Sequence, residues 1–370
     1  MVSAISLFGC LSATGLEPSA VEAAYQYSKS HGGIGMIIHE QGDVRFERYA
    51  SGHSGNKAIH IYSGTKSLFG LAAVIAEAEG ILLLSERVAD TIPEWRNDPR
   101  KREITIRELL NFTSGLETGF QQIYGRTSAD KLKLSLGLET SYPRGSSFVY
   151  GPSHLQVFCE VLQRKLAPRG ITYEDYVKRK ILMPLGIKVS RWNADAHGNV
   201  IPSAGLYLTA KDWLKFGEMV AQGGRYRHKR IVRTEVLSRC FVGTHINPAY
   251  GLTFWLNSYA PRPDSREVDV EEWLSFDTLP TDWRGACLSK RAPSDLICCL
   301  GSNFQRLYIV PSQQLVVLHQ GKKGTFRDAE FLALLFEGLP VSEIPIAKPV
   351  EPDSGFPGVF NGWRRKGKKR

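Results

Sequence analysis

The feature that most constrains this chain is a serine followed three residues later by a lysine, at the start of a long apolar run. Ser63 and Lys66 stand in Ser-Gly-Thr-Lys, and residues 67–76 are apolar or small. A helix places positions three apart on one face, so the amine of Lys66 can reach the hydroxyl of Ser63. Burial favours the neutral amine, which can take the proton of the serine. The stretch predicts an activated serine at the beginning of a buried helix.

The same Ser-x-x-Lys spacing occurs twice more, so the spacing alone does not identify a catalytic serine. Ser54 and Lys57 stand in a polar, glycine-rich segment, and Ser128 and Lys131 begin a charged one. Both segments are typical of solvated surface. Even Ser63 has an alternative interpretation as a helix N-cap, a role far commoner than catalysis. The apolar run that follows favours Ser63 over the other two serines.

The rest of the pattern predicts strands at both ends of the chain and helices between them. Helix starts are marked by a threonine followed three residues later by an acidic residue, and helix ends by glycines. The pairs are Thr105 with Glu108, Thr172 with Asp175 and Thr209 with Asp212, and the glycines are Gly80, Gly115, Gly170 and Gly223. The predicted elements are a helix over 18–30, a hairpin of 35–39 and 44–49, helices from 63 to about 223, strands over 296–300, 306–310 and 315–319, and a helix over 326–337.

This order predicts an α+β fold with one antiparallel sheet built from both chain termini and flanked by helices. A mainly helical lobe is inserted, and the active site is expected in the cleft between the lobes. We assign residues 18–62 and 224–338 to a discontinuous α/β lobe and residues 63–223 to the helical lobe. Residues 258–295 are polar and rich in proline, and are interpreted as an insertion at the rim of the cleft. Residues 339–370 form a tail with a basic C-terminus.

Composition excludes several functional classes. No apolar stretch approaches the roughly 20 residues of a membrane-spanning helix. The six cysteines contain no C-x-x-C pair or zinc-type spacing, so neither a metal nor another cofactor is expected. The formal net charge is +10, and residues 364–370 carry six of the positive charges. A short basic end of this kind is interpreted as solvated, and no specific nucleic acid is expected as a partner.

The first ten residues bear on localisation. Residues 1–10 are apolar and end in a lipobox-like Leu-Phe-Gly-Cys, but they lack a basic segment ahead of the apolar one. A cytoplasmic protein is therefore favoured, with an exported or periplasmic protein as the alternative.

Four blocks in one order give the chain a recognisable resemblance. They are Ser63-Gly64-Thr65-Lys66, residues 104–116, Tyr150 ahead of a helix, and residues 205–212. Together they resemble the β-lactamase-related serine hydrolases, a superfamily of class C β-lactamases, D,D-peptidases and family VIII carboxylesterases. The resemblance covers roughly residues 20–338. It implies a fold like that of serine β-lactamases and penicillin-binding proteins.

The resemblance also implies roles for individual residues. Ser63 would be the nucleophile, Lys66 the general base, and Tyr150 the group that passes protons between serine, lysine and leaving group. Considered alone, Tyr150 would more often be a packing residue, since aromatic side chains mostly serve packing.

A third family motif is placed at Cys299-Leu300-Gly301. Its glycine would let the strand approach the acyl carbon, so Leu300 and Gly301 are expected to contact substrate. The backbone N–H of Ser302 would join that of Ser63 as the oxyanion hole. A simple strand bulge is the alternative for Gly301. Residues 319–321, His-Gln-Gly, match the motif more closely by letters, but they end the following strand and would lie away from the serine.

Two departures from the family pattern bear on substrate. The second motif, often Tyr-x-Asn, here ends in Pro152, which is expected beside the substrate but has no donor for an amide. The third motif lacks the lysine and threonine that would hold a carboxylate. An ester needs neither aid, so these losses favour ester substrates over lactams and peptides.

The sequence thus predicts a serine hydrolase that forms an acyl-enzyme on Ser63, a carboxylesterase for small esters. One alternative is a weak β-lactamase or D,D-peptidase, and another is a binding protein on this fold that hydrolyses nothing. The expected partner is a small-molecule ester or amide. Substrate choice is assigned to residues 117–149 and 258–295, and the oligomeric state is left open.

Overall fold

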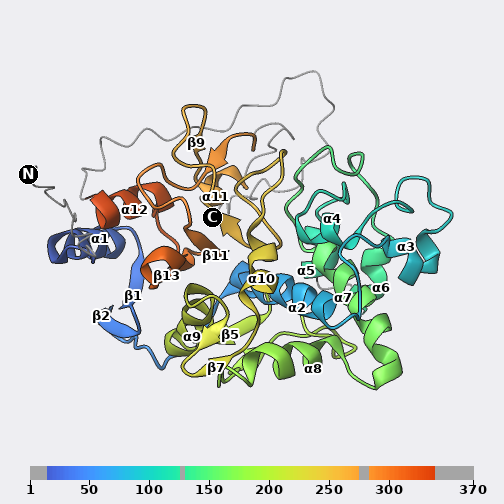
Figure 1. Ribbon diagram of the computed structural model, residues 1–370, viewed down its shortest axis with the longest axis horizontal. Coiled ribbons are helices and arrows are strands. Elements are labelled where there is room, and N and C mark those ends of the chain that lie inside the picture. The colour runs from blue at the N-terminus through green and yellow to red at the C-terminus, as the bar shows by residue number, and fades with distance from the viewer. Residues whose placement is uncertain (1–14, 126–129, 275–282, 338–370) are drawn as a thin grey trace, which may run out of the picture.

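The computed structural model describes residues 15–125, 130–274 and 283–337. Its centre is a six-stranded antiparallel sheet that draws strands from both ends of the chain (Figure 1). The strand order is β2 (Asp43–Tyr49), β1 (Gly33–Glu40), β13 (Leu315–Gly321), β12 (Gln305–Val310), β11 (Ile297–Gly301) and β8 (Trp255–Leu256). The predicted α+β fold with a sheet built from both termini is confirmed.

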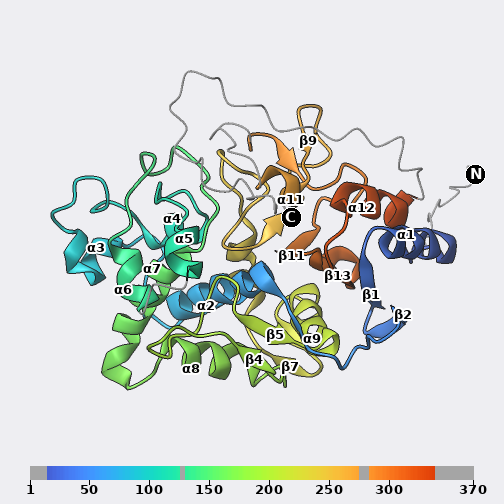
Figure 2. The ribbon, with the colours of Figure 1, turned by 180° about the vertical axis from the view of Figure 1, so that it is seen from behind.

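The helices divide between the sheet and a separate, mainly helical region. Figures 1 and 2 show α3 to α8 on one side of the molecule, β1, β2 and β13 on the other, and α2 between them. The helices are α1 (Pro18–Ser30), α2 (Lys66–Ala78), α3 (Val88–Thr91), α4 (Ile106–Leu110), α5 (Phe120–Tyr124), α6 (Lys131–Leu136), α7 (Ser153–Leu166), α8 (Tyr173–Val177), α9 (Ala210–Ala221), α10 (Thr234–Leu237), α11 (Val270–Trp273) and α12 (Asp328–Glu337). None of the helices in the described ranges is long and apolar enough to cross a membrane.

The central sheet is covered on both faces. Gly217 of α9 lies against Leu307 and Val316 of the sheet, where an added Cβ would clash with both side chains. On the opposite face, Tyr308 stacks on Phe331 of α12, with 5.7 Å between ring centroids. Successive residues of a strand point to opposite faces, so α9 and α12 enclose the sheet. Its strands therefore form the centre of the apolar core.

The two ends of the sheet meet through β1 and β13. Met36 of β1 pairs with His319 of β13, and β1 pairs with β2 in the predicted N-terminal hairpin. The hairpin turn has positive φ at Gln41 (54°) and Gly42 (91°), a backbone whose twist suits two-residue turns.

Buried apolar side chains form one continuous cluster from Val21 to Leu335, so the helical region and the sheet share a core. Helix α2 crosses that core, and its residues from Lys66 to Ala76 are all buried. The predicted division into lobes, with boundaries at residues 62 and 223, stays a prediction.

Local signals for helix ends are confirmed. The four glycines predicted to end helices have φ between 61° and 80°, the left-handed backbone that glycine adopts without strain. Thr105 and Glu108 form a complete capping box, with each side chain bonded to the other residue's backbone N–H. Thr172 and Thr209 accept hydrogen bonds from the backbone N–H groups of Asp175 and Asp212.

The start of the segment that carries Ser63 differs from the expectation. Ser63 lies in a 3-10 turn, η1 (Tyr62–Thr65), and the α-helix begins only at Lys66. The turn is tight because the backbone N–H of Gly64 bonds to the carbonyl of Ile61 at 3.0 Å. The two segments run on continuously, so Ser63 and Lys66 still share one face.

The segment 258–295 is more ordered than its composition indicated. Its described part contains β9 (Arg266–Glu267), α11 and β10 (Ala286–Cys287), and buries Trp273 and Trp283. Asn257 anchors it, because its Nδ2 donates to the carbonyl of Ser289 and its Oδ1 accepts from the N–H of Leu288. Residues 275–282 lie outside the described residues, as do Ser128, the segment 1–10 and the basic tail.

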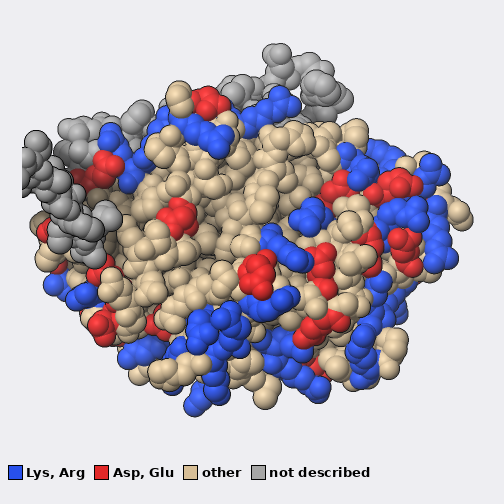
Figure 3. Space-filling model, in the orientation of Figure 1, with Lys and Arg blue, Asp and Glu red and all other residues tan. Residues whose placement is uncertain are grey.

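Positive charge also gathers on the folded part of the chain. Lys and Arg side chains collect at the lower edge of Figure 3, where Figure 1 places β7. There β6 (Arg225–Tyr226) and β7 (Lys229–Arg230) form a hairpin in which Arg225, Lys229 and Arg230 are exposed. The basic character of the chain is therefore not confined to its C-terminal residues.

Two further short strands, β3 (Ile59–His60) and β4 (Arg191–Trp192), pair on either side of β5 (Leu206–Leu208).

Candidate active site

Ser63 and Lys66 are in direct contact. Lys66 Nζ donates to Ser63 Oγ at 2.8 Å and to the carbonyl oxygen of Ser203 at 2.7 Å. The lysine is 2% exposed, so its amine has lost its solvent shell. The Ser203 carbonyl holds the amine in place while leaving it next to the serine hydroxyl.

Burial sets the protonation of this amine. It lowers the pKa of Lys66 from 10.5 to about 7, because the charged form is poorly solvated there. A substantial fraction of the amine is then neutral at pH 7 and able to accept a proton. A neutral amine within hydrogen-bond distance of a hydroxyl is the arrangement that activates a serine.

Tyr150 lies over the same pair. Lys66 Nζ is 4.8 Å from the centroid of the tyrosine ring. Burial raises the pKa of Tyr150 to about 12, although hydrogen bonds with Ser63 and Trp255 and the positive charge of Arg306 act in the opposite direction. At neutral pH Tyr150 is therefore a phenol, which can donate a hydrogen bond or pass a proton on.

Gly301 brings the end of β11 against the turn that carries Ser63. A Cβ at this position would lie 2.1 Å from the carbonyl oxygen of Ile61 and 3.2 Å from the backbone nitrogen of Gly64. Any side chain here would push the strand away from the serine. The next residue, Ser302, is exposed at the start of a turn, and Leu300 is buried in the strand. The roles of these residues toward a substrate stay predictions.

The competing match at residues 319–321 lies elsewhere. His319 lies within β13, where its Nε2 is 2.9 Å from Oγ of Ser28 in α1 and its Nδ1 is 2.8 Å from the carbonyl oxygen of Phe304. Its ring is fully buried between these partners. His319 is thus a core residue on the far side of the sheet from the contact between Gly301 and Ile61.

Pro152 is buried at the N-terminus of α7, directly after Tyr150 and Gly151. Its carbonyl accepts from the N–H of Gln156, and the N–H of Ser153 bonds to the carbonyl of Thr118. Proline suits this position because a helix start does not need its N–H. A direct contact between Pro152 and a substrate stays a prediction.

Two site residues were missed by sequence reasoning. Ser203 supplies the carbonyl that holds Lys66, and its own Oγ accepts from the hydroxyl of Tyr124 at 2.9 Å. Tyr124 ends α5, within the segment 117–149 to which substrate choice was assigned. No local pattern marks Ser203, since a backbone carbonyl leaves no trace in the residue type. Its position two residues before the block 205–212 is the one signal that could have drawn attention to it.

His154 is a further buried group near the lysine. Its Nδ1 is 3.0 Å from Ser153 Oγ, which in turn donates to the carbonyl of Glu117. Burial lowers the pKa of His154 to about 3, and the charge of Lys66 acts in the same direction. The ring is therefore neutral at any pH at which the protein would be assayed.

Within the described ranges, no group of three or more His, Cys, Asp or Glu side chains is arranged to hold a metal ion.

Comparisons with known proteins identify the family of the chain. The family model described as Beta-lactamase matches residues 19–264. Penicillin-binding protein 4* of Bacillus subtilis (strain 168) is 25% identical over 142 residues, which are 34% of this chain and 31% of that protein. The match thus spans about a third of the length of that relative.

Solved structures resemble most of the chain at low sequence identity. A class C beta lactamase from Rhodobacter sphaeroides superposes with a TM-score of 0.61 at 16% identity, covering 86% of this chain and 97% of its own. EstCE1, a hydrolase with promiscuous acyltransferase activity, superposes with a TM-score of 0.61 at 15% identity, covering 85% of this chain and 97% of its own. A D-stereospecific amidohydrolase from Streptomyces sp. superposes with a TM-score of 0.62 at 14% identity, covering 87% of this chain and 100% of its own. These likenesses establish the fold.

Proposed function

This chain belongs to the beta-lactamase family of serine hydrolases, and from that membership we propose that it forms an acyl-enzyme on Ser63 and hydrolyses small carboxylic esters. The observation that carries the proposal is the hydrogen bond of 2.8 Å between the buried amine of Lys66 and the Ser63 hydroxyl. A weak β-lactamase or D,D-peptidase is the alternative among enzymes, and a protein that binds a ligand without hydrolysing it is the alternative among other classes.

The proposed reaction begins with attack of Ser63 Oγ on the ester carbonyl. The neutral amine of Lys66 takes the hydroxyl proton, and the carbonyl oxygen becomes an oxyanion that accepts from the N–H groups of Ser63 and Ser302. Tyr150 donates its phenolic proton to the alkoxide as the C–O bond breaks and takes a proton in turn from Lys66, so an alcohol leaves, an acyl-serine remains and the amine is neutral again. Water attacks the acyl-serine with its proton taken by the same groups, which releases the acid and restores the serine.

Ester preference is supported by what the site lacks. Pro152 has no donor at the position where the family often has an amide side chain, and Cys299 and Leu300 supply neither cation nor hydroxyl for a substrate carboxylate. An alkoxide leaves more readily than an amine anion, so an ester loses least from these absences. Among proteins of this fold are a hydrolase with promiscuous acyltransferase activity and an amidohydrolase, so the fold itself does not select one kind of acyl substrate.

The test is parallel hydrolysis of p-nitrophenyl butyrate and nitrocefin, with the Ser63→Ala variant as the background. We expect Ser63-dependent release of nitrophenol and a much slower reaction with nitrocefin. Ser54→Ala is the matched control, because Ser54 heads a second Ser-x-x-Lys tetrad in an exposed loop. Nitrocefin turnover equal to ester turnover would favour the β-lactamase alternative, and no Ser63-dependent turnover of either would favour a binding protein.

The pKa of Lys66 predicts the pH dependence of the reaction. Only the neutral amine accepts the serine proton, so kcat/KM is expected to fall about tenfold per pH unit below the pKa and to level off above it. The midpoint is expected at about 7, because burial depresses the pKa of Lys66 to that value. Initial rates of ester hydrolysis measured on both sides of pH 7, and followed at the isosbestic wavelength of nitrophenol, give this midpoint. A midpoint close to the ordinary lysine value of 10.5 would contradict a buried base.

A further inference from the structure

The turn after β11 has an unusual backbone. Asn303 and Phe304, which follow Ser302, both have a φ of 58°. Residues with side chains rarely adopt this left-handed region, and two in succession are held only when their surroundings fix them. The turn carries the N–H of Ser302, so whatever fixes the turn also fixes that donor.

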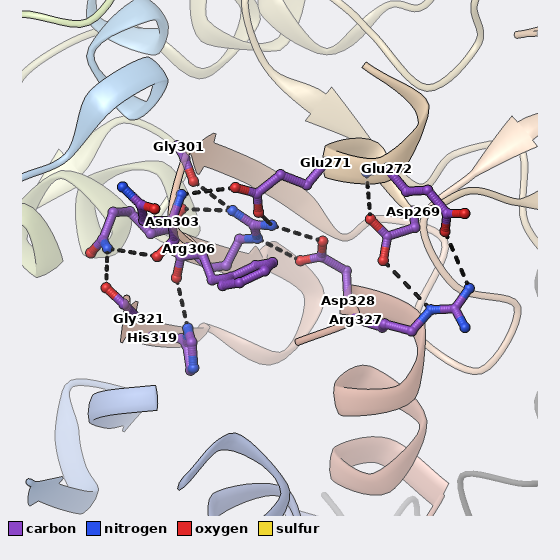
Figure 4. Close-up of polar contacts among 12 residues, drawn as sticks. Asp269, Glu271, Glu272, Gly301, Asn303, Arg306, His319, Gly321, Arg327 and Asp328 are labelled. Atoms are coloured by element: carbon purple, nitrogen blue, oxygen red, sulfur yellow. Dashed lines mark hydrogen bonds and ion pairs between the residues drawn. The ribbon is translucent and has the colours of Figure 1, made fainter. Parts of the chain in front are cut away.

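Glu271 of α11 is one of the groups that fix it. Its Oε1 accepts from the backbone N–H of Asn303 at 2.8 Å, and its Oε2 accepts from Nη2 of Arg306 at 2.8 Å (Figure 4). Glu271 belongs to the segment 258–295, so a residue distant in sequence accepts a hydrogen bond from the turn itself. The hydrogen bonds involve a charged acceptor, which makes them stronger than neutral ones.

Arg306 of β12 holds the other side of the same turn. Its Nη1 donates to the carbonyl oxygen of Gly301 at 2.6 Å, and its Nε donates to Oδ1 of Asp328 at 2.7 Å. The guanidinium is 2% exposed and Asp328 1%, so the cation is fixed by a carboxylate within the core. Arg306 is therefore held by α12 and Glu271 while it binds the backbone just before Ser302.

We propose that Glu271 and Arg306 are positioning residues that set the oxyanion hole by holding the backbone on both sides of Ser302. The inference rests on the proposed acyl-enzyme chemistry and deepens it. Arg306 fixes the carbonyl of Gly301, and Glu271 fixes the N–H of Asn303. The N–H of Ser302 lies between these two groups, so its direction is fixed as well. Glu271 thereby joins the segment 258–295 to the backbone that carries Ser302.

Glu271→Gln tests this assignment. Glutamine keeps the shape but places an NH2 group against either Asn303 N–H or Arg306, so one of the two hydrogen bonds is lost. Removal of a whole oxyanion donor costs about 10²- to 10³-fold, and we expect a displaced donor to lower kcat about tenfold with KM nearly unchanged. The affinity for phenylboronic acid, which forms a tetrahedral adduct on an activated serine, is expected to fall by the same factor. The pH midpoint set by Lys66 is expected to stay in place.

Glu272→Gln is the matched control, since Glu272 lies on the same helix but pairs with Arg327, the residue before α12, with 3.6 Å between Nη2 and Oε2. It is expected to keep wild-type kcat and boronate affinity. A second variant, Arg306→Lys, keeps the buried charge but cannot reach Gly301 and both carboxylates at once, and it is expected to repeat the kcat and boronate losses.

Three results would overturn the inference. One is a Glu271→Gln variant that melts at a lower temperature yet keeps wild-type kcat and boronate affinity. The second is loss of kcat without loss of boronate affinity. The third is a wild-type protein that binds no boronate at Ser63. This result would refute the acyl-enzyme chemistry itself. It differs from the first two results because the wild-type measurement alone reveals it.

Discussion

Replacing Lys66 with methionine is expected to lower kcat/KM for p-nitrophenyl butyrate by about 10²- to 10⁴-fold, which is the usual contribution of a positioned general base. The amine at 2.8 Å from Ser63 Oγ is the group placed to take the serine proton, and methionine offers no base. The side chain fills nearly the same volume in a fully buried site. Thermal stability is therefore expected to change little, since a buried amine also costs desolvation energy.

Lys57→Met is the matched control for this experiment. Lys57 completes the Ser-x-x-Lys tetrad of Ser54, but it lies in an exposed loop where its Nζ donates to the carbonyl of Gly52. We expect wild-type rates from this variant. Equal losses from Lys57→Met and Lys66→Met, or wild-type activity in both, would contradict the assignment of the base.

Gly301→Ala is expected to lower kcat by about 10²- to 10³-fold, as when one oxyanion donor is removed. The added Cβ would lie 2.1 Å from the carbonyl oxygen of Ile61, so β11 must move away from the turn that carries Ser63. The N–H of Ser302 moves with the strand. The same clash is expected to lower the melting temperature, because a packed core yields little to an added methyl group.

Gly137→Ala separates this effect from a general intolerance of alanine. Gly137 follows α6, has an ordinary φ of −85°, and an added Cβ there would make only an ordinary contact of 3.6 Å. It is expected to keep activity and stability. Wild-type kcat in Gly301→Ala would show that the strand does not supply the oxyanion hole.

Local signals in the sequence predicted much of the fold. Helix α1 spans the predicted residues, and the turn at Gln41 and Gly42 forms the expected hairpin. Glycines and threonine caps marked helix ends because each acts on the backbone within one turn of its own position. The order of the four motif blocks led to the family, which the match of its model to residues 19–264 confirms.

The contacts that hold the site together could not be predicted in this way. Ser203 acts through its backbone carbonyl, and Glu271 reaches Asn303 and Arg306 across more than thirty residues of chain. Such contacts depend on which segments the fold brings together in space, and the residues next to them in the sequence do not determine them. The 3-10 turn at Ser63 was also missed, and it lies where Gly301 of β11 packs closely against Ile61.

Covalent capture of the serine tests the central claim most directly. The wild-type protein would be treated with a fluorophosphonate, digested, and the modified peptide identified by mass spectrometry, alongside Ser63→Ala and Lys66→Met. The account predicts one adduct on Ser63, no adduct in Ser63→Ala, and strongly slowed labelling in Lys66→Met. A folded wild-type protein that stays unlabelled, or that is labelled on another serine such as Ser54, would contradict it.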